Sequence, residues 1–82
     1  MLILTAKRNV VLQLIYYMPD HPSLLQEFTW GYTDSVPELR RTHGFLNYWR
    51  RNIQATINKV LISVDDREWQ DYSNVIHLYK IN

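Results

Sequence analysis

The chain has 82 residues, a formal net charge of +1, no cysteine and 13% aromatic residues. This length fits one small domain, residues 1–82, which buries only about 60% of the surface of its unfolded chain. The missing cysteines exclude disulfides, thiolate catalysis and Cys-ligated metal sites. The small net charge excludes a strong attraction to polyanions over the whole molecule.

The first eight residues place their charges after a short apolar stretch, which is the reverse of the order in a signal peptide. The longest apolar run, from Val10 to Met18, is far shorter than the roughly 20 residues that span a bilayer. We therefore expect a cytoplasmic protein with no membrane partner.

Residues 9–18 predict a strand, because β-branched and aromatic residues are dense and alternate along the run. Both faces of this strand are largely apolar, which is typical of a central strand covered on two sides. The spacing of Val10, Val11, Leu14 and Ile15 also suits a helix, and that alternative stays open.

Two prolines, Pro19 and Pro22, bracket Asp20 and His21. Proline lacks a backbone donor and pushes the preceding residue toward an extended conformation, and Asp20 can bond locally to the backbone as an Asx turn. The segment therefore predicts a chain reversal.

A second strand is predicted over residues 24–32, where Phe28, Trp30 and Tyr32 alternate with small or polar residues. This strand has an aromatic face and forms a hairpin with the first.

Residues 34–37 end the second strand and open a helix. Gly44 costs a helix about 1 kcal/mol relative to Ala, so the regular part is expected to begin near Thr42. One broad apolar face runs along this helix and consists of Leu39, Thr42, Phe45, Leu46, Trp49 and Ile53.

Alternation predicts a third strand over residues 56–64 and a fourth over residues 75–81. Between them, the spacing of Asp65 and Glu68 predicts a short helical turn through Asp71.

The order of these elements predicts an α+β fold, a small antiparallel sheet of three to four strands in the order β-β-α-β-β with one main helix on one face. The other face must be solvated or paired, so self-association through it is expected.

The most specific block of the sequence consists of Tyr16, Met18, Pro19, Asp20, His21, Pro22, Leu24, Leu25 and Gln26. Three further features follow this block at fixed spacings, namely Trp30, Asp34 with Pro37, and Phe45-Leu46 with Trp49. In these residues the chain resembles the Usg-like family of small bacterial proteins, and the match covers about residues 13–64. Departures include Val36 where the family has Ala and Asn47 where it has an acidic residue. The resemblance implies a small accessory or regulatory protein, associated with the neighbourhood of tryptophan-biosynthesis genes, with no catalytic residue to carry over.

Asp20 and His21 are the first candidates for a functional role. Adjacent side chains in an extended turn point apart, and the sequence places no nucleophile beside them. We therefore expect Asp20 and His21 to form a structural turn or a partner-binding tip rather than a catalytic pair. The three histidines fall in different elements without metal-ligand spacing, so no metal or other cofactor is expected.

We interpret the chain as a non-enzymatic interaction module that binds itself or another protein and has no small-molecule substrate. The candidate partner contacts are Asp20, His21, Trp30 and Tyr32. The alternative is an RNA- or DNA-associated protein that uses the helix residues Arg40, Arg41, Arg50 and Arg51.

Overall fold

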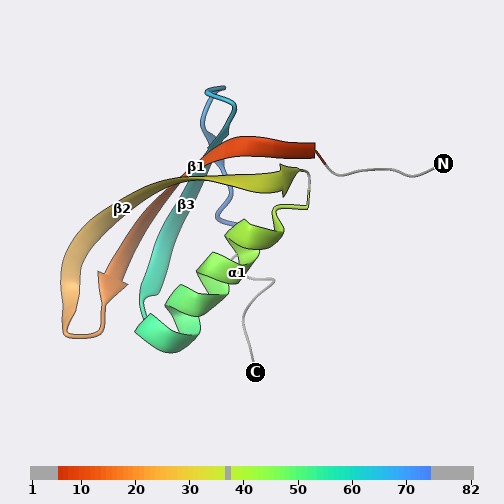
Figure 1. Ribbon diagram of the computed structural model, residues 1–82. Coiled ribbons are helices and arrows are strands. Elements are labelled where there is room, and N and C mark those ends of the chain that lie inside the picture. The colour runs from red at the N-terminus through yellow and green to blue at the C-terminus, as the bar shows by residue number, and fades with distance from the viewer. Residues whose placement is uncertain (1–5, 37, 75–82) are drawn as a thin grey trace.

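The computed structural model describes residues 6–36 and 38–74, and Figure 1 shows their arrangement. Four antiparallel strands form one sheet in the order β2-β1-β3-β4. The strands are β1 (Ala6–Met18), β2 (His21–Val36), β3 (Thr56–Val64) and β4 (Gln70–Asp71). One helical segment connects β2 to β3 and consists of α1 (Arg40–Tyr48) and the π-helical turn η1 (Trp49–Ile53). The predicted α+β fold with one helix on an antiparallel sheet is confirmed.

β1 is a strand rather than a helix, and it is central as expected, since it pairs with β2 on one side and β3 on the other. Val10, Leu12 and Leu14 point to one face and are buried, while the odd-numbered residues between them are only partly buried. The expected cover on both faces is not seen among the described residues, because α1 lies against one face of the sheet only.

The hairpin between β1 and β2 turns at Pro19 and Asp20, and Met18 pairs with His21. β2 is longer than the predicted strand, since β1 pairs with it as far as Val36. Pro22 is compatible with this strand because β2 lies at the edge of the sheet, where one side of its backbone has no strand neighbour among residues 6–36 and 38–74.

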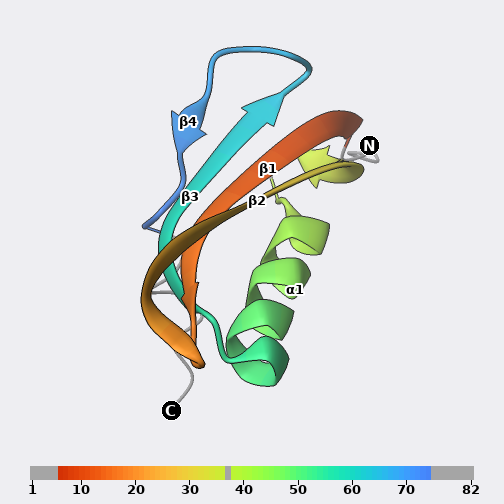
Figure 2. The same cartoon turned by 90° about the vertical axis from the view of Figure 1, so that its left-hand side faces the viewer.

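Residues 34–36, which were expected to open the helix, still belong to β2, and α1 begins at Arg40, close to the expected start of the regular helix near Thr42. Figure 2 shows the sheet curving around α1, which lies on the concave face. No element within residues 6–36 and 38–74 covers the opposite, convex face.

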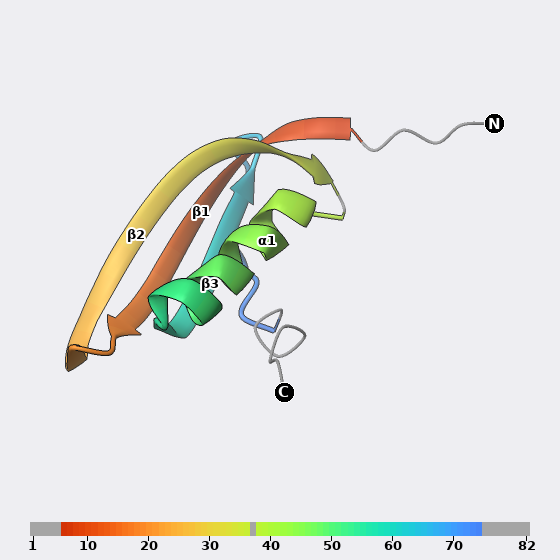
Figure 3. The ribbon, with the colours of Figure 1, turned by 60° about the horizontal axis from the view of Figure 1, so that its bottom comes forward.

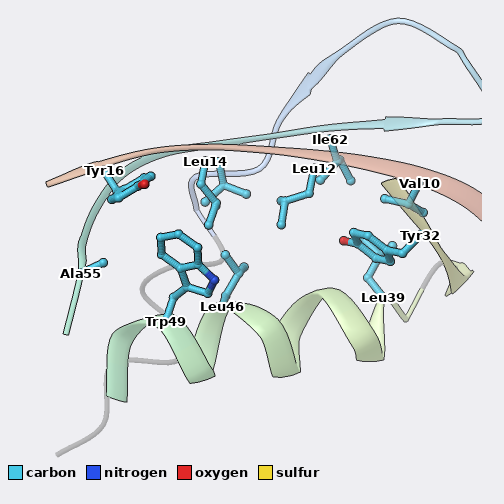
Figure 4. Packing of buried hydrophobic residues seen from close by; sticks show 11 residues of the cluster. Val10, Leu12, Leu14, Tyr16, Tyr32, Leu39, Leu46, Trp49, Ala55 and Ile62 are labelled. Carbon is cyan, nitrogen blue, oxygen red and sulfur yellow. The ribbon is translucent and has the colours of Figure 1, made fainter. Parts of the chain in front are cut away.

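The core lies between the concave face and the helix (Figure 4). Trp49 meets Tyr16 edge to face, with ring centroids 4.7 Å apart. The buried hydrophobic residues are Val10, Leu12, Leu14, Tyr16, Tyr32, Leu39, Leu46, Trp49, Ala55, Val60 and Ile62.

β3 spans the predicted residues 56–64. The short helical turn predicted after it is wrong. Asp65 and Asp66 have φ angles of 51° and 59°, and the Arg67 N–H donates to the Val64 carbonyl at 3.1 Å. Positive φ at both central residues is the signature of a type I′ turn, and Asp tolerates this conformation better than most residues. The fourth strand predicted over residues 75–81 lies outside the described residues, and the fourth strand of the structure is β4.

The Asp65 carboxylate anchors this turn to the start of β1. It lies 2.6 Å from the Arg8 guanidinium and accepts the Asn9 N–H at 3.1 Å. These contacts hold the pKa of Asp65 below its usual value.

Candidate functional site

The most connected polar group in the described structure is the carboxylate of Asp34, near the end of β2. Its side chain lies beneath the first turn of α1, and the residue is only 2% exposed. Oδ1 accepts the N–H groups of Ser35 at 2.7 Å and Arg41 at 3.0 Å. Oδ2 accepts the N–H of Thr42 at 2.7 Å and its hydroxyl at 2.6 Å. Asp34 therefore caps the helix from a neighbouring strand.

The helix needs this cap because its own N-cap residue cannot supply one. Leu39 occupies that position with a φ of 51° and makes no side-chain capping bond, and its side chain is buried. The first N–H groups of a helix have no partner within the helix, and a carboxylate that accepts them is favoured by the helix dipole. Asp34 accepts hydrogen bonds from two of these N–H groups, those of Arg41 and Thr42.

The hydroxyl of Tyr32 extends the cluster, since it lies 2.5 Å from the Thr42 hydroxyl. The single proton of Thr42 Oγ1 is donated to Asp34, so Tyr32 is the donor to Thr42. The three residues form a directed chain from the phenol to the carboxylate. Burial raises the pKa of Tyr32 to about 12.

The protonation behaviour of Asp34 indicates a structural role. Burial alone would raise the pKa of Asp34, but the hydrogen bonds from Thr42, Arg41 and Ser35 outweigh it and hold that pKa below its usual value. A carboxylate that already accepts four hydrogen bonds has little capacity to act as a general base.

An open depression of about 390 Å³ lies beside this cluster. At its rim Arg40 pairs with Glu38 at 2.5 Å. Its lining consists of Lys7, Asp34, Ser35, Glu38, Arg40 and Arg41. The Ser35 hydroxyl is buried and has no hydrogen-bond partner among the described residues, so the depression offers no activated nucleophile there.

Asp20 and His21 lie at the turn of the hairpin, which stands clear of the helix in Figure 3. Their side chains are 73% and 64% exposed, and His21 Nε2 lies 3.7 Å from Asp20 Oδ2. The next residues of β2 include Leu24 and Leu25, which are 56% and 49% exposed. We call residues 20–25 the hairpin tip.

Trp30 and Tyr32 lie away from the tip, on the concave face beneath the helix. Their ring centroids are 4.3 Å apart, and Trp30 also packs on Phe45 at 4.6 Å. The Arg41 guanidinium lies over both rings, at 5.3 and 5.8 Å. Tyr32 is buried and Trp30 half-buried, so Tyr32 has little surface to offer a partner. The aromatic face of β2 is thus the face that the helix covers.

The four helix arginines form two pairs rather than one cluster. Arg40 and Arg41 are exposed in the first turn of α1, whereas Arg50 and Arg51 lie in η1. Arg51 lies eleven positions after Arg40, which corresponds to roughly 16 Å along a helix. Tyr48 lies between the pairs and is 54% exposed.

The residues that the structure describes contain no group of three His, Cys, Asp or Glu side chains that could hold a metal ion. His43 lies beside Tyr72 instead, with Nε2 3.5 Å from the phenol oxygen. No helix among these residues is long and apolar enough to cross a membrane.

Sequence reasoning missed two features of this region. The capping role of Asp34 depends on the packing of β2 beneath the helix, and a lone Asp near a helix start was its only signal in the sequence. The exposure of Leu24 and Leu25 was also missed, because two leucines within a predicted strand ordinarily indicate core.

Comparison with known proteins supports the resemblance noted from the sequence. The model of the Usg-like family matches residues 4–78. "Protein usg" of Caulobacter vibrioides is 31% identical over 70 residues, which cover 80% of this chain and 79% of that protein. No solved structure matches the chain. The chain therefore belongs to the Usg-like family.

Proposed function

We propose that this chain is a small, non-enzymatic protein-interaction module of the cytoplasm, which contacts itself or another protein through the hairpin tip. The observation that carries this proposal is the pair of half-exposed leucines, Leu24 and Leu25, beside the exposed Asp20 and His21. Apolar side chains of this size, set beside polar groups at a protruding end, are typical of contact surfaces.

The chemistry of the interior supports a binding role over an enzymatic one. The most connected buried carboxylate, Asp34, is committed to capping the helix, and its pKa is lowered rather than raised. General bases that work near neutral pH usually have raised carboxyl pKa values.

The test is capture of partner proteins from the native lysate at moderate salt by three forms of the tagged chain. These are the wild type, the double variant Leu24→Ser/Leu25→Ser, and a control with Thr33→Ser, which alters an exposed residue of the same strand. We expect the wild type and the control to retain the same protein, and the double variant to lose it while remaining folded. Equal capture by all three forms would refute a role for the tip.

The second candidate is an RNA- or DNA-associated protein that uses the outward side of the helix. The observation that favours it is charge, because residues 40–53 contain four arginines and no acidic residue. Tyr48 adds an exposed ring on which a base can stack.

Binding of mixed single-stranded oligonucleotides over a salt series tests this alternative. If Arg40 and Arg51 contact phosphates, each change to Gln reduces the slope of log affinity against log salt by about 0.7. A matched control is Arg67→Gln, which alters an exposed arginine in the turn after β3. The absence of binding at low salt would remove the nucleic-acid hypothesis.

A further inference from the structure

Beyond the hairpin tip, the outer edge of β2 is regular and has no strand neighbour among the described residues. Residues 26–36 each pair with one residue of β1, and the irregular pairing lies nearer the turn, between His21 and Gln26. Edge strands are usually protected by charges, especially lysine, because they otherwise pair with other chains. Residues 26–36 contain no Lys or Arg, and their acidic residues are Glu27 and the buried Asp34.

Two sets of hydrogen bonds show which backbone groups of β2 point to this edge. The Ser35 N–H donates to the Asp34 carboxylate, and the Ser35 carbonyl accepts the Leu39 N–H at 2.6 Å, so both groups point away from β1. On β1, the N–H and the carbonyl of Asn9 both bond to Asp65, which follows β3 on the far side from β2. Neither Ser35 nor Asn9 therefore uses its backbone in the ladder between β1 and β2.

Bonded and non-bonded positions alternate along an antiparallel pair. Asn9 lies opposite Thr33, so the odd-numbered residues of β2 turn their N–H and carbonyl groups outward. Among the described residues, no hydrogen bond from outside β2 and its ladder reaches the backbone of the exposed positions Glu27, Thr29, Gly31 and Thr33. This part of the edge can accept a further strand.

Gly31 lies in the middle of this edge, although nothing in the described chain requires a glycine there. Its φ angle is not positive, and a Cβ added to it would meet no atom within 4 Å. Glycine weakens a strand, and within strands it often marks a point where another backbone or a ligand approaches closely. Gly31 leaves room for a bulky side chain on an added strand.

Arg41 places a positive charge beside this edge. Its guanidinium lies over the rings of Trp30 and Tyr32 on the concave side, and the residue is exposed. It pairs with no acidic side chain among the residues that the structure describes. Side chains of an added strand that lie opposite Trp30 or Tyr32 point to the same concave side and come within reach of Arg41.

We propose that residues 27–33 of β2 bind an extended acidic segment of another protein as an additional strand, with a carboxylate of that segment next to Arg41. The backbone of such a segment supplies affinity, and its alternate side chains supply specificity. This surface is separate from the hairpin tip, so the inference goes beyond the proposed function and can fail independently of it.

β2 of a second copy fits this edge less well. Outward-facing positions pair with outward-facing positions, so odd-numbered residues would lie opposite odd-numbered residues. Glu27 of the second copy would then stay on the convex face, away from Arg41. The carboxylate of Asp34 is already bonded as the helix cap.

Peptide selection tests the preference for an acidic segment. The probe is a displayed library of short random peptides, selected on the immobilised full chain and then synthesised. We expect enriched peptides to carry an acidic residue next to a bulky apolar one, which would lie opposite Gly31. Arg41→Gln should weaken their binding about fivefold, as expected for an exposed ion pair, whereas the control Arg67→Gln should bind like the wild type. Enriched peptides without acidic residues, or equal binding by both variants, would overturn the proposal.

Residue-resolved amide hydrogen exchange locates the bound peptide. A selected peptide should slow exchange at Thr29, Gly31 and Thr33 about tenfold or more, because outward N–H groups gain a partner. The amides of Trp30 and Tyr32 face β1 and should change little. Slowing confined to other residues would overturn the proposal. The same slowing in the concentrated free chain, together with a dimer mass, would assign the edge to a second copy and also overturn it.

A proline variant tests the edge itself. Thr29→Pro removes an outward N–H and keeps the ladder to β1, as is typical of proline in edge strands. It should weaken peptide binding about tenfold or more, whereas Thr29→Ser keeps the N–H and should bind normally. Normal binding by Thr29→Pro with an unchanged circular dichroism spectrum would overturn the proposal. If that variant does not fold, Arg41→Gln and the exchange measurement decide. The lysate capture experiment at Leu24 and Leu25 decides the proposed function separately.

Discussion

The carboxylate of Asp34 accepts both the backbone N–H and the side-chain hydroxyl of Thr42, at 2.7 and 2.6 Å. Both residues are almost fully buried, at 2% and 0% exposed. This double contact joins the end of an edge strand to the first turn of the only helix in the described structure. It therefore fixes where the helix starts and how it lies on the sheet.

Replacing Asp34 by Asn should destabilise the fold by roughly 1–3 kcal/mol, because an amide nitrogen would face N–H donors and leave one of them buried without a partner. Urea unfolding at pH 7 measures the change. The matched control is Asp66→Asn, since Asp66 is exposed and Asn tolerates its positive φ. Equal stability of the two variants would contradict the capping role.

Acid should reduce the difference in stability between the wild type and Asp34→Asn. The pKa of Asp34 is lowered in the folded state, so its contribution is complete above the unfolded pKa, about 3.9, and is lost as pH falls through the folded value. The pKa values of Asp65 and Asp71 are also lowered, so the wild type alone would report several groups. Unfolding free energies of both proteins at pH 7, 5 and 3 isolate Asp34. A difference that stays constant down to pH 3 would contradict the account.

Tyr32→Phe should cost about 0.5–1.5 kcal/mol at pH 7, because it removes the phenol that donates to Thr42. We expect this difference in the free energy of unfolding to disappear at alkaline pH. The pKa of Tyr32 is raised to about 12, so the stability it contributes is complete below pH 10 and is lost between pH 10 and 12. Denaturation of both proteins from pH 8 to pH 12 gives the comparison. A wild-type advantage that persists at pH 12 would show that the phenol is not buried in this chain of bonds.

Asp66→Gly should stabilise the protein by up to about 1 kcal/mol, because glycine adopts the positive φ at this position without steric cost. Thermal unfolding measures this as a rise in Tm. Asp66→Val is the contrasting variant and should lower Tm, since a β-branched residue is strained at positive φ. A fall in Tm for the glycine variant would argue against the type I′ turn.

Elements whose pattern is local could be predicted from the sequence. The period of two in residues 56–64 located β3, and the apolar stripe containing Leu46 and Trp49 identified the helix face that is buried. For residues 9–18 the sequence predicts a strand with a helix as the alternative, because only the pairing with β2 and β3 distinguishes the two. Pairing between distant segments has no signature within one short window of sequence.

The unpredicted packing of the helix on the aromatic residues of β2 and the wrong prediction for the turn after β3 also arise from contacts between distant segments. Alternation placed Trp30 and Tyr32 together on one face of β2 but could not show that the helix packs on that face. The spacing of Asp65 and Glu68 fitted a helix cap, yet Asp65 adopts positive φ and binds Arg8 from the far end of the chain. The exposed turn at Asp20 and His21 was expected, since prolines restrict backbone geometry locally.

The most direct test of the interaction role is photo-crosslinking in the native cell with a benzoylphenylalanine at one position at a time. The account predicts that Leu24→benzoylphenylalanine yields a discrete protein adduct, whereas the same change at the exposed Asp66 yields none. Equal adducts at both positions, or nucleic-acid adducts at Arg51 with none at Leu24, would contradict the claim that the hairpin tip is the contact surface.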